Sequence, residues 1–257
     1  MAPSGAPVRA FLEICSGDVE GYGALQQRYL ATQSHITKIG PQYGWDVADL
    51  KPEDLDEEQR DVLASDPSLS STLLFDKPKP ISLGHLTLEL NPSANLSRTR
   101  ENFVALLEGS KGFSKADRNK KLHYAGCNVH RIETGFCLQS GDVTRGDGSG
   151  GEAATSGTIK AEAEGLSIKP VYGSLCMASG TRKDSISSQF FIVLATQEKE
   201  LAKLGPRKYV TFGNVLLDDS SQGQEGAAVL TQVESLGTST GTPVQKVWIG
   251  DCGLSKA

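Results

Sequence analysis

Two alternating segments, Val8–Ile14 and Ile81–Leu90, place the strongest constraint on the fold. Apolar and polar residues largely alternate in both, which is the pattern of strands that bury one face. Further short strands are predicted at residues 128–133, 136–139, 173–178, 189–194, 210–215 and 244–250. Two predicted helices, 97–108 and 226–236, keep apolar residues on one side and end at a glycine. Many short strands with two well-separated helices favour a mainly β fold, a closed barrel capped at its ends.

The segment between the first two strands, residues 17–78, differs in composition from the rest of the chain. It has a mostly helical pattern, and Trp45–Asp66 contains nine acidic and two basic residues, a net charge of −7. The whole chain carries −5, so the remainder is at +2. The sequence therefore predicts a single domain over residues 1–257 with an acidic helical insertion. That insertion is either a decoration packed on the domain or a docking element for a basic protein partner.

Composition argues against several functional classes. No lysine–arginine block or basic stripe is present, so nucleic-acid binding is not expected. No run of about 18 apolar residues occurs, and the N-terminus lacks a signal-peptide pattern, so no membrane segment is expected. Five scattered cysteines without a CxxC pair, and four histidines without metal-ligand spacing, predict free thiols and no metal site. We expect a cytoplasmic protein, with the nucleus as an open alternative.

Two patterns that could carry chemistry have simpler interpretations. Residues 145–151, RGDGSGG, are rich in glycine but lack the spacing and the following helix of a phosphate-binding loop. Cys137 lies seven residues from His130, and no carboxylate is evident to orient the pair. A small buried thiol and a core histidine are therefore favoured over a nucleophile and its base.

The stretch from 129 to 142, VHRIETGFCLQSGD, is not explained by a plain strand pair. Arg131 and Gln139 stand close in sequence to Phe136, and a phenylalanine pair, Phe190-Phe191, follows later in the chain. One interpretation is a salt-bridged strand arginine above core phenylalanines, and the other is the wall of an active site. Spacing alone favours neither.

A series of short motifs runs through the chain in a fixed order. The motifs are LTLEL (86–90), TRENF (99–103), GSKGF (109–113), LHYAG (122–126), HR (130–131), GF (135–136), QSGD (139–142), GSGG (148–151), GSLCMA (173–178), SQFF (188–191), VTFG (210–213) and DCG (251–253). The series resembles the cyclophilin family of peptidyl-prolyl cis-trans isomerases, over roughly residues 8–15 and 79–254. The resemblance implies an eight-stranded antiparallel barrel with a helix over each end. It also implies isomerisation of X-Pro bonds in proline-containing peptides and proteins, assisting protein folding.

The resemblance assigns roles to residues of this sequence. Arg131 matches the family's catalytic arginine, Phe136 matches the wall of the proline pocket, and Gln139 is expected to orient Arg131 or to bind the substrate backbone. The other substrate-binding positions that it implies are Cys137, Gly148, Ala178, Ser179, Gly180, Gln189, Phe191, Leu204 and Tyr209. No metal, cofactor or covalent intermediate is needed.

This sequence departs from the family pattern at the rim of the pocket. Cys137, Ser179 and Tyr209 stand where the family has methionine, asparagine and histidine, and Lys203 stands at the position of a tryptophan. Loss of the indole removes apolar contact and a hydrogen-bond donor, so weak cyclosporin binding is predicted. An alternative function is a weakly active scaffold that holds proline-containing segments and docks partners through the insertion. We expect the protein to be a monomer.

Overall fold

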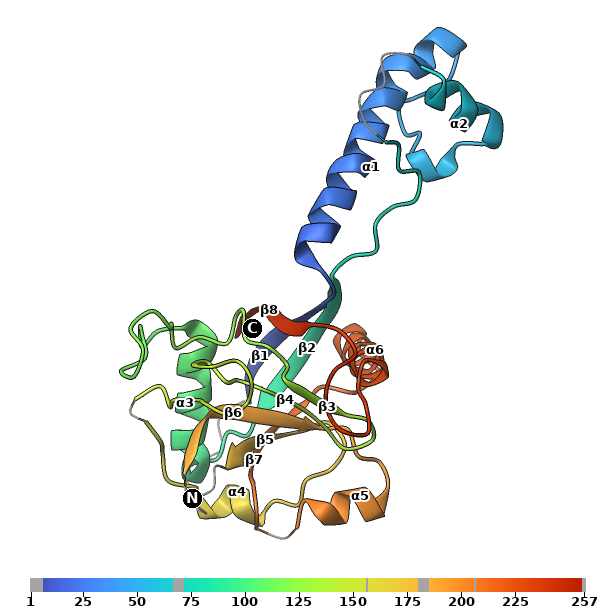
Figure 1. Ribbon diagram of the computed structural model, residues 1–257. Coiled ribbons are helices and arrows are strands. Elements are labelled where there is room, and N and C mark those ends of the chain that lie inside the picture. The colour runs from blue at the N-terminus through green and yellow to red at the C-terminus, as the bar shows by residue number, and fades with distance from the viewer. Residues whose placement is uncertain (1–6, 67–71, 156, 180–184, 206, 256–257) are drawn as a thin grey trace. The chain divides into compact units, whose positions relative to one another are not determined.

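The computed structural model describes residues 7–66, 72–155, 157–179, 185–205 and 207–255. The chain forms two compact units, one from Met1–Ser16 with Ser82–Ala257 and the other from Gly17–Ile81 (Figure 1). Each unit has its own apolar core, so each is described by itself. The first contains the sheet and every motif named above.

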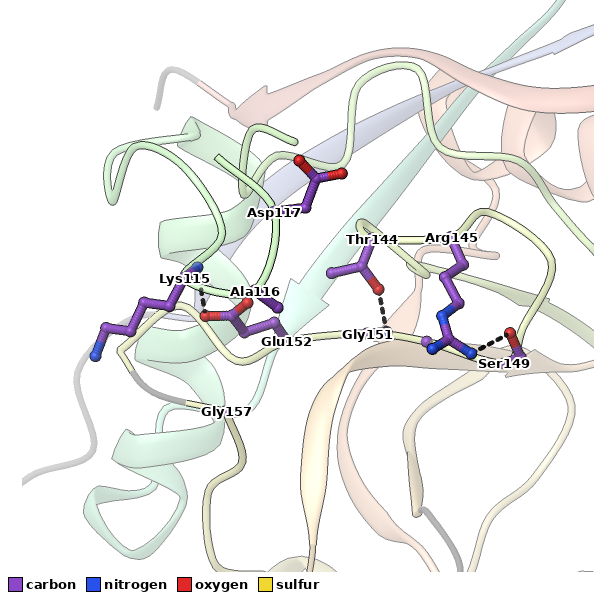
Figure 2. Close-up of a pocket in the computed structure, with 10 residues that line it drawn as sticks. Lys115, Ala116, Asp117, Thr144, Arg145, Ser149, Gly151, Glu152 and Gly157 are labelled. Atoms are coloured by element: carbon purple, nitrogen blue, oxygen red, sulfur yellow. Dashed lines mark hydrogen bonds between the residues drawn. The ribbon is translucent and has the colours of Figure 1, made fainter. Parts of the chain in front are cut away.

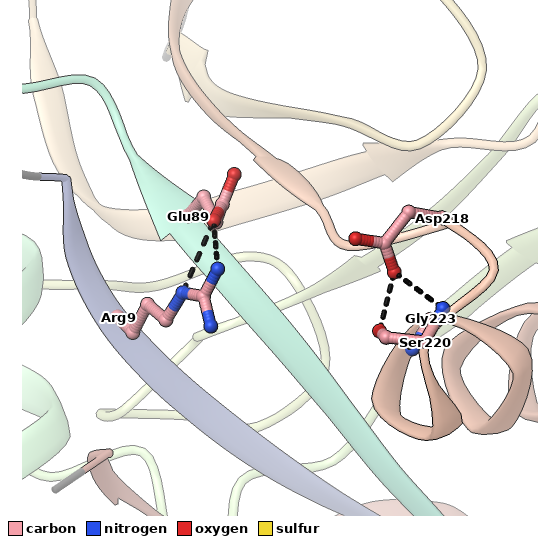
Figure 3. Close-up of polar contacts among 5 residues, drawn as sticks. All are labelled: Arg9, Glu89, Asp218, Ser220 and Gly223. Atoms are coloured by element: carbon pink, nitrogen blue, oxygen red, sulfur yellow. Dashed lines mark hydrogen bonds and ion pairs between the residues drawn. The ribbon is translucent and has the colours of Figure 1, made fainter. Parts of the chain in front are cut away.

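Eight antiparallel strands form one sheet in the larger unit (Figure 1). They are β1 (Val8–Ser16), β2 (Ser82–Leu90), β3 (Arg131–Glu133), β4 (Cys137–Ser140), β5 (Ser174–Ser179), β6 (Ile186–Val193), β7 (Val210–Val215) and β8 (Val247–Leu254). The order across the sheet is β3-β4-β6-β5-β7-β2-β1-β8. Strands β1 and β2 pair directly, with Arg9 opposite Glu89. Their side chains form an ion pair, Nη2 to Oε1, at 2.7 Å (Figure 3).

The fold is mainly β and antiparallel, as predicted, but the prediction that the barrel is closed is wrong. In the described part of the chain no strand ladder joins β3 to β8, and the sheet is curled rather than closed. Both backbone polar groups of Ile132 in β3 are already bonded, its N–H to the Gly241 carbonyl and its carbonyl to the Thr238 N–H. Strand β8 instead meets the segment before β3, where the Val129 N–H donates to the Val247 carbonyl at 2.9 Å.

Two longer helices pack on this sheet. Helix α3 (Ser97–Glu108) agrees with the predicted range, and α6 (Ser221–Ser235) begins five residues earlier than predicted. The earlier start follows from Ser220, whose side chain accepts the Gly223 N–H as an N-cap. Two short helices, α4 (Ala163–Ser167) and α5 (Glu198–Lys203), and a 3₁₀ turn, η3 (Ala94–Leu96), lie in the connections.

The centre of the main core is an aromatic group around Phe103 of α3. The ring of Phe103 lies 5.1 Å from Tyr124, 5.3 Å from Phe190 and 5.0 Å from Phe212. All four side chains are fully buried. The Tyr124 hydroxyl donates to the Ser188 carbonyl at 2.7 Å, which satisfies its only polar atom. This packing fixes β6, and with it the neighbouring residue Phe191.

The second unit, Gly17–Ile81, contains α1 (Val19–Ile39), η1 (Gly40–Tyr43), η2 (Pro52–Asp54) and α2 (Glu57–Ala64). Its core consists of Ile36, Ile39, Leu55 and Leu63, with Trp45 packed against them. Helix α2 starts with a capping box, in which Asp56 accepts the Gln59 N–H at 2.8 Å. None of the helices that the structure describes, in either unit, is long and apolar enough to cross a membrane.

Candidate active site

A tight hairpin positions Arg131 and Gln139 on one face of the sheet. Strands β3 and β4 pair with Arg131 directly opposite Gln139, and directly opposed residues project their side chains to the same side. The chain reverses at Gly135, whose φ of 70° suits a residue without a β-carbon. The Phe136 N–H closes the turn on the Glu133 carbonyl at 2.9 Å.

The neighbouring strands extend this row of side chains. Gln139 of β4 lies opposite Phe191 of β6, and Phe191 lies opposite Cys176 of β5. Four strands therefore bring Arg131, Gln139, Phe191 and Cys176 side by side, although up to 60 residues separate them along the chain. Sequence periodicity could not show this row, because it depends on which strands pair.

An apolar cluster lies along this row. Its buried members are Cys137, Cys176, Phe191, Val193, Ala195 and Leu204, and its partly buried members are Phe136, Ala178, Leu201 and Tyr209. Within it, the rings of Phe191 and Tyr209 meet edge to face with centroids 4.9 Å apart. The structure thus brings together Phe136, Cys137, Ala178, Phe191, Leu204 and Tyr209, six of the residues expected from the sequence.

Arg131 lies at the margin of the apolar cluster. Its guanidinium carbon is 5.9 Å from the centroid of the Phe136 ring, and its side chain is 42% exposed. The guanidinium binds the Glu133 carboxylate, two residues along the same strand face. Gly241 packs on the aliphatic part of Arg131, where a β-carbon would lie 2.9 Å from Cγ. Sequence reasoning missed Glu133, although the alternation of β3 could have placed it beside Arg131.

A model of the family described as "Cyclophilin type peptidyl-prolyl cis-trans isomerase/CLD" matches residues 79–254. The chain belongs to this family. It is therefore a peptidyl-prolyl cis-trans isomerase, an enzyme that acts on proline-containing peptides. The match includes the hairpin, the row across the sheet and the apolar cluster.

Two glutamines continue the row in this cyclophilin-type isomerase. The Gln139 amide donates to Gln189 Oε1 at 2.8 Å, and the Gln189 amide donates to the carbonyls of Gly148 at 2.9 Å and Gly150 at 2.7 Å. The amide of Gln139 is thus directed towards Gln189, on the side of the loop that contains Gly148. The expected residues Gln139, Gln189 and Gly148 are joined by these bonds.

Asp142 organises the loop that carries Gly148. Its Oδ2 accepts the N–H groups of Gly148 and Gly150 at 2.9 Å each, and its Oδ1 accepts those of Thr144 and Arg145. Burial raises the pKa of the Asp142 carboxyl, but these donors outweigh it and lower the pKa to about 2. The loop also contacts His130, because Gly148 has no β-carbon to collide with the imidazole. Burial lowers the pKa of His130, which favours a neutral ring.

The remaining predictions at the site have different outcomes. Burial raises the pKa of the Cys137 thiol to about 11, which opposes a nucleophilic role. All five cysteines are free and buried.

In the described ranges no three His, Cys, Asp or Glu residues gather as a metal site. Gly180 and the side chain of Ser179 lie outside the described residues, so their expected substrate contacts stay predictions.

A separate cavity of about 550 Å³ lies beside the loop that Asp142 organises (Figure 2). It is lined by Lys115, Ala116, Asp117, Thr144, Arg145, Ser149, Gly150, Gly151, Glu152 and Gly157. Glu152 accepts the Lys115 N–H at 3.2 Å, and Thr144 accepts the Gly151 N–H at 2.7 Å. None of the lining residues belongs to the apolar cluster, so the cavity and the cluster are distinct features of the surface.

Proposed function

We propose that the apolar cluster holds the proline ring of an X-Pro segment while Arg131 donates a hydrogen bond to the prolyl nitrogen. The single observation that carries this proposal is the position of the Arg131 guanidinium at the margin of the cluster, 5.9 Å from the Phe136 ring. A proline ring on Phe136 would bring its nitrogen next to a permanently charged donor.

The chemistry explains why this arrangement would accelerate rotation. An amide resists rotation by about 18–20 kcal/mol because the nitrogen lone pair is delocalised. Twisting the bond localises the lone pair on nitrogen, where it can accept a hydrogen bond. A fixed donor aimed at that nitrogen binds the twisted state more tightly than either planar isomer, and this difference lowers the barrier.

Arg131 is suited to this role by its packing. A guanidinium has five N–H donors, and the bond to Glu133 leaves others for a substrate. Gly241 lies against the aliphatic part of the side chain and restricts its rotamers. The buried neighbours Phe191 and Leu204 exclude water beside the reacting bond, which strengthens an electrostatic interaction there.

We propose that the glutamine pair and the end of β5 bind the backbone of the substrate. Gln139 and Gln189 form a hydrogen-bonded strip that connects the Arg131 row to the loop with Gly148. The ladder between β5 and β7 ends at Met177 opposite Val210, so Ala178 lies beyond the last pair on that side. An extended peptide could pair with the backbone beyond Met177, which is the role expected for the segment 178–180.

We also propose that the clients are exposed X-Pro segments of folding proteins. The five free cysteines support a reducing compartment such as the cytosol or the nucleus. The scaffold alternative is less favoured, because Arg131, Phe136 and Gln139 all lie inside the matched range and beside the apolar cluster. We keep a docking role for the acidic unit Gly17–Ile81 as a proposal compatible with catalysis.

Replacing Arg131 with alanine tests the mechanism. We expect kcat/KM to fall by about 100-fold or more, as for loss of a donor that acts in the transition state. Arg131→Lys should recover little, since an ammonium lacks the planar fork of donors. The matched control is Arg9→Ala, which removes an exposed arginine from the Glu89 ion pair and should leave turnover unchanged. An unchanged rate for Arg131→Ala with an intact fold would refute the proposal.

A further inference from the structure

The margin of the apolar cluster carries three cations. Arg131 of β3 and Lys203 of α5 both lie over the Phe136 ring, each 5.9 Å from its centroid. Lys208 Nζ lies 5.1 Å from the centroid of Tyr209, whose ring packs on Phe191. Two aromatic rings of the proposed proline site therefore each have an ammonium group directly over them. We call Lys203 and Lys208 the lysine rim.

The charges of the margin do not cancel. Glu133 binds Arg131, and Glu200 binds Lys203 one helical turn earlier. Within the described part of the chain, Lys208 has no carboxylate in an ion pair. Three cations and two carboxylates leave the margin positive, whereas the whole chain carries −5. The site is therefore positive at the place where a peptide would approach it.

The ammonium groups remain accessible to a ligand. The Lys203 side chain is 51% exposed, and Lys208 is also exposed. An ammonium has three N–H donors, so Lys203 can bind a second carboxylate while it keeps Glu200. Contact with a ring limits the positions of each charge, which reduces the conformational entropy lost when a ligand binds.

We propose that this isomerase selects X-Pro segments with an acidic side chain immediately before or immediately after the proline, and that the lysine rim makes the selection. The inference rests on the proposed placement of proline on the apolar cluster. With the ring on Phe136 and Tyr209, the side chains that flank the proline lie within reach of Lys203 or Lys208. A carboxylate there gains an ion pair in an environment that the cluster partly shields from water.

A peptide series of equal shape and different charge tests the proposal. Peptides with one proline carry Glu, Gln or Lys immediately before or immediately after it, and kcat/KM is measured by NMR exchange at low ionic strength. At one or both positions we expect Glu to exceed Gln by about 3- to 10-fold and Lys to fall below Gln. At 1 M salt, where the Debye length is about 3 Å, the Glu-to-Gln ratio should approach one.

Charge-neutral variants assign the selection to the lysine rim. The Glu-to-Gln ratio of kcat/KM should fall towards one in the double variant Lys203→Gln/Lys208→Gln. It should stay unchanged in the matched control Lys246→Gln, which removes the charge of an exposed lysine near β8. A wild-type ratio of one at both positions, or a ratio that survives the double variant, would overturn the inference. Failure of the proposed mechanism is distinguishable, because there Arg131→Ala would retain turnover on all peptides.

Discussion

Glu133 binds the guanidinium of Arg131 from two positions along the same face of β3. The arginine proposed to act on the prolyl nitrogen therefore already has a carboxylate partner before substrate arrives. Neither residue is deeply buried, with side chains 42% and 21% exposed, so the pair is of the kind that contributes little stability. The pair matters because Glu133 competes with the substrate for the guanidinium of Arg131.

We expect Glu133→Gln to raise kcat/KM by about 2- to 5-fold. An exposed ion pair is worth about 0.2–1 kcal/mol, and removing it frees the donor for the twisted amide. The measurement is NMR exchange or a protease-coupled assay with a neutral peptide. Glu89→Gln, which loses the ion pair to Arg9, is the control and should not change the rate (Figure 3). A fall in kcat/KM would instead show that Glu133 positions the arginine.

The contribution of Asp142 to the stability of the fold should depend on pH. The folded pKa of about 2 lies below the ordinary 3.8, so ionised Asp142 stabilises the fold above about pH 4. That contribution is lost as the pH falls from 4 towards 2. Asp142→Asn turns an N–H group towards backbone donors and should cost about 1–3 kcal/mol at pH 7. Urea unfolding at several pH values measures the free energy of unfolding of the wild type and of Asp142→Asn. The difference between the two should shrink below pH 4, and a difference that does not depend on pH would contradict this assignment.

Cyclosporin should bind weakly, and Lys203→Trp should strengthen the binding. Lys203 Nζ lies over the Phe136 ring, so an indole at this position would extend the apolar cluster. Burying such a side chain contributes about 1.5–3 kcal/mol, or roughly 10- to 100-fold in Kd. Calorimetry compares the wild type with Lys203→Trp and with Lys199→Trp, an exposed indole on the same helix. Wild-type binding as tight as that of Lys203→Trp would refute the prediction.

The acidic unit should be dispensable for turnover. Cys15 of β1 pairs with Ser82 of β2, so the chain leaves and re-enters the sheet at adjacent positions. Replacing Gly17–Ile81 with Asn-Gly leaves a three-residue loop, Ser16-Asn-Gly, between Cys15 and Ser82. The product should be a folded enzyme with kcat/KM within about 2-fold for short peptides. Binding of a basic partner protein, measured by pull-down, should be lost. A large loss of turnover on short peptides would show that the unit contributes to catalysis.

Local patterns predicted much of this fold. Alternation in 8–14 and 81–90 identified β1 and β2, because a strand with one buried face leaves a period-two signature. The apolar stripe of α3 predicted its range for the same kind of reason. The start of α6 was missed because its first turn, Ser221 to Gln224, has no apolar stripe and depends on the Ser220 cap.

The candidate site was predictable only in part. The order of motifs placed Arg131, Phe136 and Phe191 in one site, and the structure brings all three to one face. The bond from Gln139 to Gln189 was not predictable, because amide side chains can turn to several partners of similar energy. The contact of Lys203 with the Phe136 ring likewise appears only when α5 lies against the cluster, whereas Lys208 and Tyr209 are adjacent in the chain.

The sequence by itself determined the strand and helix types and, through its ordered motifs, the family and its chemistry. These depend on side-chain periodicity and residue identity, which are local properties of the chain. Only the tertiary structure decided whether the sheet closes. The backbone groups of Ile132 bind residues 238 and 241, more than 100 positions away, so β3 is not free to pair with β8. The same long-range packing brought Gly241 against the side chain of Arg131, at the margin of the proposed proline site.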